Sequence, residues 1–396
     1  MVVNFLLISL PKKILILGAG FGGLAAANLL RSKLDSSHQI VVIDRKAWFM
    51  MGLVKLWILE GTRGLEDSKT SLRALASRGI EYLCDEITSI DPSSKSVETA
   101  NHGTFTADYM IVALGAELAP ELVSGFSGTG YNLYNAPELP KLRERLLSLK
   151  SGHVAITIMG APYKCPPAPF EACMIIDELL RKNNTRDSTS IAVYSPAPIA
   201  LPVAGPKISE SVTEMLSKRG IEFHASSKPK AVSGNRLEFD NGTGVEFAVL
   251  IGIPQHVPPQ VIKESKLASG TPAGWIAVNR ETLQTDFEGV YAIGDATEIK
   301  VSPTIALPKA GIFAEEEAKI VSARILNEIN PDEYRDKPSF LGKGFCFMET
   351  GTGQAGYLEA DFFGQQNPVL KLELPSHQNL EKKREFERSR LSEWLL

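Results

Sequence analysis

A glycine-rich turn between a strand and a helix, a second alternation of strands and helices, and a late buried strand predict an α/β fold. The first pattern occupies residues 12–34, the second 136–219 and the third 289–297. Alternation of this kind forms parallel sheets with helices on their faces. We therefore predict two Rossmann-like dinucleotide-binding domains and a small C-terminal region made of a hairpin and a helix. The expected boundaries are 1–118 with 265–330 for the first domain, 119–264 for the second, and 331–396 for the C-terminal region.

The composition is that of an ordinary globular protein. Of 396 residues, 44% are apolar and 22% are charged, and the net charge of −4 gives no basis for nucleic-acid binding. The four cysteines are too few for a disulfide scaffold, and neither they nor the six scattered histidines have metal-ligand spacing. The apolar run at 1–10 lacks the features of a signal peptide and is shorter than the ~20 residues that span a bilayer. We interpret it as a short extension before the first strand.

Hydrophobic periodicity predicts the elements of the chain in order. The first domain is expected to have strands within 12–17 and 38–46 around a helix, a meander of short strands beginning at residue 80, and a buried strand at 109–114. The second is expected to have helices at 136–149, 171–182 and 208–219, strands at 154–159 and 190–194, and short strands within 234–253. A strand at 289–297, a helix at 310–329, a hairpin at 343–363 and a charged helix at 379–396 complete the chain.

The first turn, Gly18-Ala-Gly20-Phe-Gly22-Gly23, has the spacing of a dinucleotide fingerprint. Gly18 permits the tight turn, Gly20 lets a pyrophosphate approach the backbone, and Gly23 lets the helix pack closely on the strand. The helix N-terminus favours the negative charge of the phosphates. Asp44 ends the next strand about 20 residues later, where a carboxylate accepts hydrogen bonds from a ribose hydroxyl. A dinucleotide site is therefore expected here.

Two later motifs favour FAD as the dinucleotide. Asp295 lies in GVYAIGDAT, just after a buried strand, and the string YMIVALGA at 109–116 precedes the passage into the second domain. With the glycine turn, these motifs resemble the two-dinucleotide-binding-domain flavoproteins, whose fold is glutathione-reductase-like, over residues 12–330. The resemblance implies that Asp295 binds the ribityl chain of FAD. The cofactor-binding residues expected from it are Gly18, Ala19, Gly20, Phe21, Gly22, Gly23, Asp44, Arg45, Ile87, Ala113, Gly115, Asp295 and Lys309.

The corresponding turn of the second domain does not keep the fingerprint. Residues 159–171 read MGAPYKCPPAPFE, with Pro162 and Cys165 where the second and third glycines of the pattern stand. The prolines of this turn have no N–H to donate to a phosphate. The later strand ends at Ser195 and Pro196, without an acid for a ribose. The sequence therefore argues against a nicotinamide cofactor.

A cysteine pair is the candidate chemistry of this second turn. Cys165 precedes a helix, and a helix N-terminus lowers the pKa of a thiol and raises its reactivity. Its candidate partner for two-electron chemistry is Cys346, on the C-terminal hairpin. The alternative for each is a small apolar residue of the core. We expect Cys84 and Cys173 to be structural.

Three strings resemble the sulfide dehydrogenase group of flavoproteins: KCPPAPFE at 164–171, LPKAG at 307–311, and the late CFMETG at 346–351. That group contains the sulfide:quinone oxidoreductases and the flavoprotein subunit of flavocytochrome c sulfide dehydrogenase. The match covers nearly the whole chain, and the Cys-Pro-Pro-x-Pro-x-Glu string looks most like the flavocytochrome subunit. The resemblance implies an enzyme that oxidises sulfide.

The resemblance also implies roles for individual residues. Cys165 and Cys346 would form a redox-active disulfide beside the flavin, and hydrosulfide would attack it. Cys165 would carry the resulting persulfide, the Cys346 thiolate would pass two electrons to FAD, and sulfur would leave as polysulfide or elemental sulfur. Glu171 is a candidate base, with favourable charge at a helix N-terminus as its alternative role. Lys309 is expected near the flavin pyrimidine ring, with solvation at the surface as the alternative.

Two departures from that group alter the expectations. The flavocytochrome subunit can hold FAD through a cysteine shortly after the ribose-binding acid, but residues 44–57 contain none. We therefore predict non-covalent FAD. Many quinone-linked members have a third cysteine, for which only the poorly placed Cys84 is available. The length of the sulfur product is left open.

The electron acceptor is expected to be a quinone, with cytochrome c as the alternative. Leu391, Trp394 and Leu395 form an apolar stripe flanked by arginines, so the last helix either touches a membrane surface or docks on the protein. We expect a cytoplasmic protein, while peripheral attachment to the membrane, a periplasmic location and a homodimer stay open. Two other functions also stay open: an NADH:quinone-type dehydrogenase, which the missing second fingerprint opposes, and a non-catalytic flavin protein whose cysteines act as a redox sensor.

Overall fold

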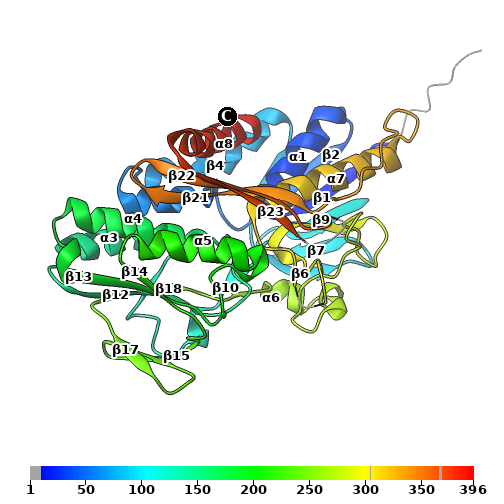
Figure 1. Ribbon diagram of the computed structural model, residues 1–396. Coiled ribbons are helices and arrows are strands. Elements are labelled where there is room, and N and C mark those ends of the chain that lie inside the picture. The colour runs from blue at the N-terminus through cyan, green and yellow to red at the C-terminus, as the bar shows by residue number, and fades with distance from the viewer. Residues whose placement is uncertain (1–9, 304, 365–367) are drawn as a thin grey trace, which may run out of the picture.

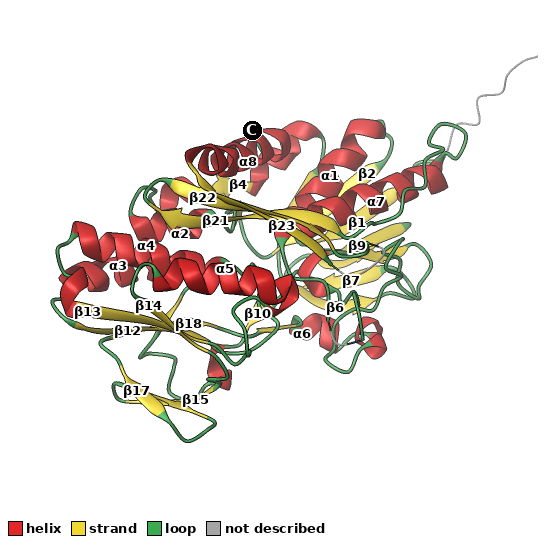
Figure 2. Cartoon of the chain, in the orientation of Figure 1, coloured by secondary structure: helices red, strands yellow, loops and turns green. Residues whose placement is uncertain are grey.

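Two five-stranded parallel sheets organise the chain, which confirms the expected α/β fold (Figure 1). The computed structural model describes residues 10–303, 305–364 and 368–396. The extension expected at 1–10 therefore lies, except for Leu10, outside the described residues. Figure 2 shows helices packed on both sheets and a third, antiparallel sheet close to the C-terminal helix.

The first sheet combines the beginning of the chain with a strand from far along it. Its order is β20 (Val290–Ala292), β9 (Tyr109–Val112), β1 (Lys13–Leu17), β2 (Gln39–Asp44) and β5 (Glu81–Cys84), all parallel. Its strands are runs of Ile, Leu and Val because both faces are covered. One face packs against α1 (Phe21–Lys33) and α7 (Gly311–Ile329). The other face packs against the meander β6 (Ile87–Asp91), β7 (Ser96–Thr99) and β8 (Gly103–Thr106), and α6 (Gln260–Lys263).

The second sheet has the order β11 (Tyr131–Asn132), β18 (Val249–Ile253), β12 (Gly152–Ile158), β13 (Thr189–Tyr194) and β14 (Ile221–His224), again all parallel. One face packs on α2 (Val54–Glu60), α3 (Leu139–Ser148), α4 (Ala168–Lys182) and α5 (Gly205–Ser217). The antiparallel strands β15 (Pro229–Ser233), β16 (Arg236–Phe239) and β17 (Gly244–Glu246) cover the other. The chain crosses between the two sheets after β9 and again after β18. The two crossing segments pair as a short antiparallel ladder of β10 (Glu117–Leu118) and β19 (His256–Val257).

The C-terminal region is a three-stranded sheet and one helix. The predicted hairpin is confirmed as β21 (Lys343–Gly351) and β22 (Gln354–Asp361), and β23 (Val369–Ser376) adds a third strand. The sequence analysis missed β23, although VLKLE alternates with the period of a strand. The helix α8 (His377–Trp394) then packs on β22 and α1, while β21 lies against α4 (Figure 1). A short ladder of β3 (Trp48–Phe49) and β4 (Thr70–Ser71) completes the strands.

The helix α4 begins earlier than expected. Its first residue is Ala168, three positions before the predicted Glu171. The proline-rich run before it reads as a helix breaker, but proline is well tolerated in a first turn, where backbone N–H groups have no partner within the helix. The earlier start places Cys165 close to the beginning of α4.

Candidate active site

The glycine turn between β1 and α1 has the geometry that a dinucleotide requires. Gly18 has a φ of +102°, and a Cβ there would lie 2.4 Å from the oxygen of Ala113. A Cβ at Gly23 would lie 1.9 Å from the oxygen of Gly18, so helix and strand pack more closely than any side chain permits. Gly20, by contrast, has nothing within 4 Å of its Cβ position. The backbone at the start of α1 is therefore open to a pyrophosphate group.

Asp44 is held at the edge of this turn. Its carboxylate accepts hydrogen bonds from the backbone N–H of Ala19 at 2.7 Å and of Lys46 at 2.8 Å. Arg45 and Ile87 are also expected to bind the cofactor, but neither lies in the glycine turn. Arg45 is exposed and faces Glu86 and Glu117, while Ile87 packs in the core beneath the sheet. The structure holds Asp44 at the glycine turn, and the roles of Asp44, Arg45 and Ile87 in cofactor binding stay predictions.

Lys309 connects the two halves of the site. It is buried, so it does not play the solvated surface role that was its alternative. Its Nζ donates to the backbone oxygens of Asp295 at 2.7 Å and Thr297 at 3.1 Å, and lies 3.4 Å from the centre of the Trp275 ring. Its own backbone oxygen accepts from the N–H of Cys165 at 2.9 Å. One residue therefore touches both the Asp295 turn and the cysteine turn.

Glu317 is a site residue that the sequence analysis missed. Its Oε2 accepts from the backbone N–H of Gly294 at 2.5 Å, beside Asp295. Burial raises the pKa of Glu317 to about 8, and burial lowers the pKa of Lys309 to about 8. Nothing in the sequence distinguishes Glu317 from Glu315 and Glu316, because only the packing of α7 buries it at this turn.

Cys165 and Cys346 belong to different parts of the chain. Cys165 lies between β12 and α4, and Cys346 lies on β21, which packs against α4. Both are thiols that pack against the same hydrophobic core. β21 packs on α4, and a negative charge on Cys165 adds to the increase that burial causes in the pKa of Cys346. Cys165 has a φ of +52°, a left-handed conformation that is uncommon for residues other than glycine and is typical of functional sites.

The expectation of a lowered thiol pKa at Cys165 is wrong. Burial raises the pKa of Cys165 to about 12, Glu171 raises it further, and Lys383 acts in the opposite direction. Burial and the neighbouring Cys165 also raise the pKa of Cys346 well above its usual value. Two prolines separate Cys165 from Ala168, the first residue of α4, so desolvation outweighs the influence of the helix N-terminus.

Glu171 belongs to a buried ionic network beside the cysteines. The Nζ of Lys383, on α8, donates to Glu171 Oε1 and to Glu349 Oε2, each at 2.9 Å. The N–H of Glu349 donates to Glu171 Oε1 at 2.8 Å, and Trp57 Nε1 donates to Glu349 Oε1 at 2.9 Å. Burial raises the pKa of Glu171, and Lys383 opposes that increase. Glu349 belongs to the CFMETG motif, whereas no motif in the sequence indicates a role for Lys383 or Trp57.

The second fingerprint position is closed. The Ala161–Pro162 peptide bond is cis, and the Gln255 side-chain oxygen lies 2.5 Å from where a Cβ of Gly160 would be. The side chain of Gln255 therefore fills the space over the first glycine of the turn. This turn therefore differs from the turn between β1 and α1, where the Cβ position of Gly20 has nothing within 4 Å.

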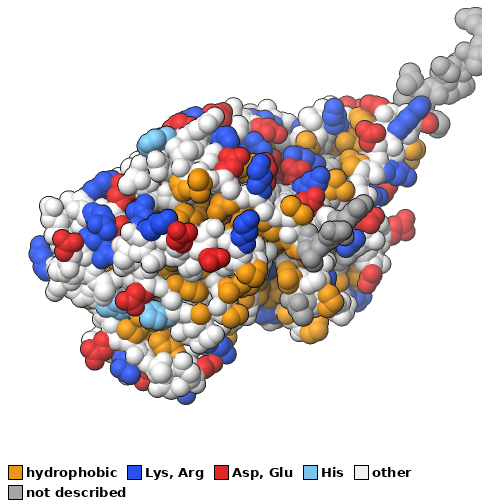
Figure 3. Space-filling view, viewed as in Figure 1, with side chains coloured by type: hydrophobic (Ala, Val, Ile, Leu, Met, Phe, Trp, Pro, Cys, Tyr) orange, Lys and Arg blue, Asp and Glu red, His pale blue; other side chains and the backbone are white. Residues whose placement is uncertain are grey.

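The apolar stripe of α8 docks on the first domain. Trp394 is 1% exposed and packs edge-to-face against Phe21 at 5.5 Å and Phe49 at 6.1 Å between ring centres, and Leu395 is buried as well. The stripe was expected either to touch a membrane or to dock on the protein, and in the structure it docks on the protein. Figure 3 shows one face of the molecule, on which apolar and charged side chains are mixed. Among the described residues, no helix is both long and apolar enough to cross a bilayer.

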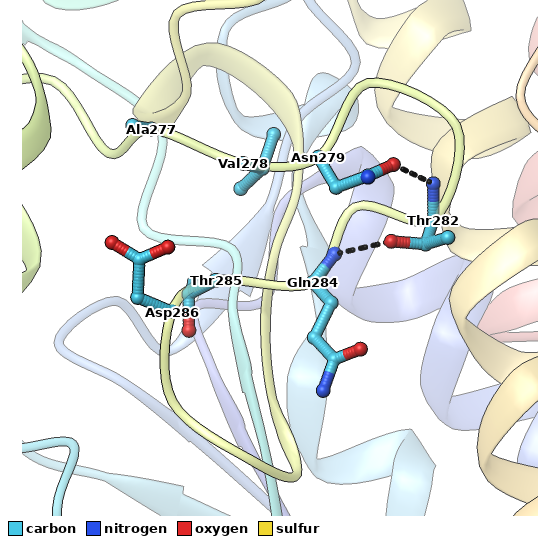
Figure 4. Close-up of a pocket in the computed structure, with 7 residues that line it drawn as sticks. All are labelled: Ala277, Val278, Asn279, Thr282, Gln284, Thr285 and Asp286. Atoms are coloured by element: carbon cyan, nitrogen blue, oxygen red, sulfur yellow. Dashed lines mark hydrogen bonds between the residues drawn. The ribbon is translucent and has the colours of Figure 1, made fainter.

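A separate surface hollow lies in the loop that precedes β20 (Figure 4). Its lining is Ala277, Val278, Asn279, Thr282, Gln284, Thr285 and Asp286. Hydrogen bonds within the loop hold it, from the Thr282 N–H to Asn279 and from the Gln284 N–H to the Thr282 hydroxyl. None of these side chains is a thiol, a lysine or a histidine.

The fold and the site define a class of protein. An open glycine turn in one domain, a closed one in the other, and a cysteine pair between them are typical of a dinucleotide-dependent disulfide oxidoreductase. The open turn beside Asp44 suits the pyrophosphate of a dinucleotide such as FAD.

The comparisons with known proteins agree with this class. The family model for pyridine nucleotide-disulphide oxidoreductases matches residues 12–312. The mitochondrial sulfide:quinone oxidoreductase of Dictyostelium discoideum is 30% identical over 312 residues, which cover 74% of this chain and 67% of that protein. The crystal structure of the Aquifex aeolicus sulfide:quinone oxidoreductase superposes with a TM-score of 0.84 at 22% identity, over 96% of this chain and 90% of that one.

A more distant relative has a different substrate in its name. The type II NADH:quinone oxidoreductase of Staphylococcus haemolyticus is 23% identical over 386 residues, which cover 91% of this chain and 93% of that protein. The chain belongs to the pyridine nucleotide-disulphide oxidoreductases and, within that family, to the sulfide:quinone oxidoreductases.

Proposed function

We propose that this protein is an FAD-dependent sulfide:quinone oxidoreductase. It oxidises sulfide to polysulfide or sulfur through the Cys165–Cys346 pair and passes the electrons through FAD to a quinone. The observation that supports the proposal is that Cys165 and Cys346 pack against the same core, while the N–H of Cys165 donates to Lys309, whose Nζ binds the Asp295 turn. In the proposed cycle, the oxidised Cys165–Cys346 pair is the electrophile that sulfide attacks.

The residues of the chain divide the chemistry between them. In the oxidised pair, hydrosulfide attacks Cys165, a persulfide forms there, and Cys346 leaves as a thiolate. Lys309 holds the cysteine turn and the Asp295 turn at a fixed separation through its backbone oxygen and its Nζ. Bound FAD supplies the two-electron acceptor and the route to the quinone. Glu171 is the proposed base for protons released at the cysteines, and Lys383 holds its carboxylate in place.

The alternative of NADH oxidation has relatives with that activity in their names, but the second domain opposes it. The Gln255 side chain lies over Gly160, and the prolines of this turn have no N–H to donate to a phosphate. We therefore expect sulfide, and not NADH, to bleach the oxidised flavin absorbance of the purified protein. Anaerobic titration with each reductant separates the two functions, and bleaching by NADH alone would remove the sulfide proposal.

The acceptor is tested in the same preparation. After one equivalent of sulfide, a soluble quinone should restore the oxidised flavin spectrum rapidly, whereas cytochrome c should restore it slowly. Parallel stopped-flow mixing with each acceptor measures both rates. A faster reoxidation by cytochrome c would reassign the protein to the flavocytochrome type.

We also propose that FAD is bound without a covalent link, because residues 44–57, after the ribose-binding acid, contain no cysteine. Acid precipitation should release all of the yellow colour into the supernatant, and mass spectrometry of the protein should show the mass of the bare chain. A Gly23→Val variant should lose FAD, because its Cβ would lie 1.9 Å from the oxygen of Gly18. Flavin that stays with the precipitated protein would contradict the proposal.

A further inference from the structure

A cluster of basic and aromatic side chains borders Cys165 and has no role in the chemistry described above. Lys55 projects from α2, and its Nζ donates to the backbone oxygen of Tyr134 at 2.7 Å. That Nζ lies 5.8 Å from the centre of the Tyr134 ring, and the His256 ring packs edge-to-face on the same ring at 5.4 Å. The Tyr134 hydroxyl donates to the backbone oxygen of Lys164 at 2.6 Å. Tyr134 therefore holds Lys55 and His256 beside the turn of Cys165.

His256 presents a buried acceptor that lacks a partner among the described residues. It is 1% exposed, and its Nδ1 lies 3.1 Å from the backbone oxygen of Pro254, a contact in which the nitrogen must donate. A neutral imidazole that donates from Nδ1 carries a lone pair on Nε2. In the part of the chain that the structure describes, nothing donates to that Nε2. An unpaired acceptor in the interior costs on the order of 1–3 kcal/mol, so this one indicates a ligand that carries a donor.

The surroundings keep His256 neutral. Burial lowers the pKa of His256 to about 3, and the positive charges of Lys164, Lys309 and Lys55 act in the same direction. The hydrogen bond to Pro254 opposes this change. The imidazole therefore stays an acceptor at Nε2 over the whole neutral pH range.

Lys55 contributes a positive charge whose proton is readily exchanged. Burial lowers the pKa of Lys55 to about 7, Lys164 and Lys46 act in the same direction, and a negative charge on Cys165 acts against them. Within the described residues, no carboxylate is hydrogen-bonded to its Nζ. Such an amine takes a proton from a weak acid at neutral pH and then attracts the conjugate base.

We propose that Lys55 and His256 form the hydrosulfide-binding site next to Cys165, an inference that rests on the proposed function. Hydrogen sulfide gives one proton to the Lys55 amine, and the hydrosulfide stays paired with the resulting ammonium while its S–H donates to His256 Nε2. The hydrosulfide sulfur then forms a bond to Cys165 Sγ, the Cys165–Cys346 bond breaks, and Cys346 leaves with the electron pair as a thiolate. An anion with one donor matches this cation and acceptor, whereas a halide would leave Nε2 unpaired.

The first test measures how fast sulfide bleaches the flavin in stopped-flow mixing at sulfide concentrations below saturation. Lys55→Met should slow bleaching by about tenfold to a hundredfold, and His256→Phe should slow it too, since it keeps the ring but loses the acceptor. Lys141→Met, on the exposed face of α3, is the matched control and should keep the wild-type rate. Flavin content and melting temperature show that the variants are folded. A wild-type rate in Lys55→Met would overturn the inference.

The second test does not depend on catalysis. In a reduced Cys84→Ser background, mass spectrometry follows the alkylation of Cys165 by anionic iodoacetate and by neutral iodoacetamide. Lys55→Met should lower the iodoacetate-to-iodoacetamide rate ratio by about fivefold or more, because the attracting charge is gone, and His256→Phe should leave it unchanged. An unchanged ratio in Lys55→Met would overturn the anion site. Failure of sulfide to bleach the wild-type flavin would remove the proposed function instead, and the alkylation ratio would still report on the site.

Discussion

Reduction of the flavin by sulfide is expected to fall by about a thousandfold or more in Cys165→Ser and in Cys346→Ser. A serine oxygen cannot form the disulfide that hydrosulfide attacks, so either substitution removes the electrophile. FAD should stay bound, because the glycine turn and Asp44 are formed by other elements. Anaerobic stopped-flow absorbance after mixing with sulfide measures the rate, and the flavin-to-protein absorbance ratio measures retention of the cofactor.

Cys84→Ser is the control for the cysteine variants. Cys84 is exposed at the end of β5, and its Sγ lies 3.8 Å from the backbone oxygen of Arg45. Its substitution should leave the sulfide rate unchanged. Full sulfide reduction in a single turnover by either Cys165→Ser or Cys346→Ser would exclude the disulfide mechanism and favour direct attack of sulfide on the flavin.

Lys383→Met is expected to destabilise the protein by about 3–5 kcal/mol, the usual cost of breaking a buried ion pair by removing one partner. Lys383 is 3% exposed in its side chain and is hydrogen-bonded to both Glu171 and Glu349. Without the ammonium, two carboxyl groups remain buried side by side. The variant should also lose sulfide reduction, because the network joins β21, which carries Cys346, to α4.

The destabilisation should depend on pH in a defined direction. With Lys383 removed, burial raises the pKa of Glu171 without an opposing charge. An acid whose folded pKa exceeds its unfolded pKa stabilises the fold below the unfolded pKa, and that contribution disappears as the pH rises through the folded pKa. The deficit of Lys383→Met should therefore be smallest in acid and grow toward neutral pH, as urea denaturation at several pH values can measure.

The neighbouring lysine provides a matched control for this prediction. Lys382 lies on the same helix, has a side chain 46% exposed, and is 3.8 Å from Glu373. Lys382→Met should change the free energy of unfolding by less than about 1 kcal/mol. Combining Lys383→Met with Glu171→Gln and Glu349→Gln should recover part of the lost stability, because no unpaired charge remains. Equal stability of Lys383→Met and Lys382→Met would refute the role given to the network.

Local patterns in the sequence were enough to predict the two parallel sheets and the dinucleotide turn. The spacing from Gly18 to Gly23 and the acid at Asp44 follow from the steric needs of a strand, a tight turn and a helix, all within one short stretch. The same logic showed that Pro162 and Cys165 break the second turn. The cysteine pairing came from resemblance to a known group, and in the structure the two residues pack against the same hydrophobic core.

Other properties of the site required the tertiary structure. The pKa of Cys165 is raised, against the expectation from its helix, because burial is decided by the packing of β21 and α4. The apolar stripe of Trp394 and Leu395 is equally consistent with a membrane surface or a protein surface until α8 is seen docked on Phe21.

The sequence by itself determined the fold class, the intact first glycine turn and the broken second one, because each depends on residues close together in the chain. Only the tertiary structure decided that Lys383 joins Glu171 to Glu349 and that Lys55 and His256 meet at Tyr134. These groupings unite residues from separate elements, and charge, burial and pKa depend on all the neighbours in space. Hydrophobic periodicity records only which face of an element is buried.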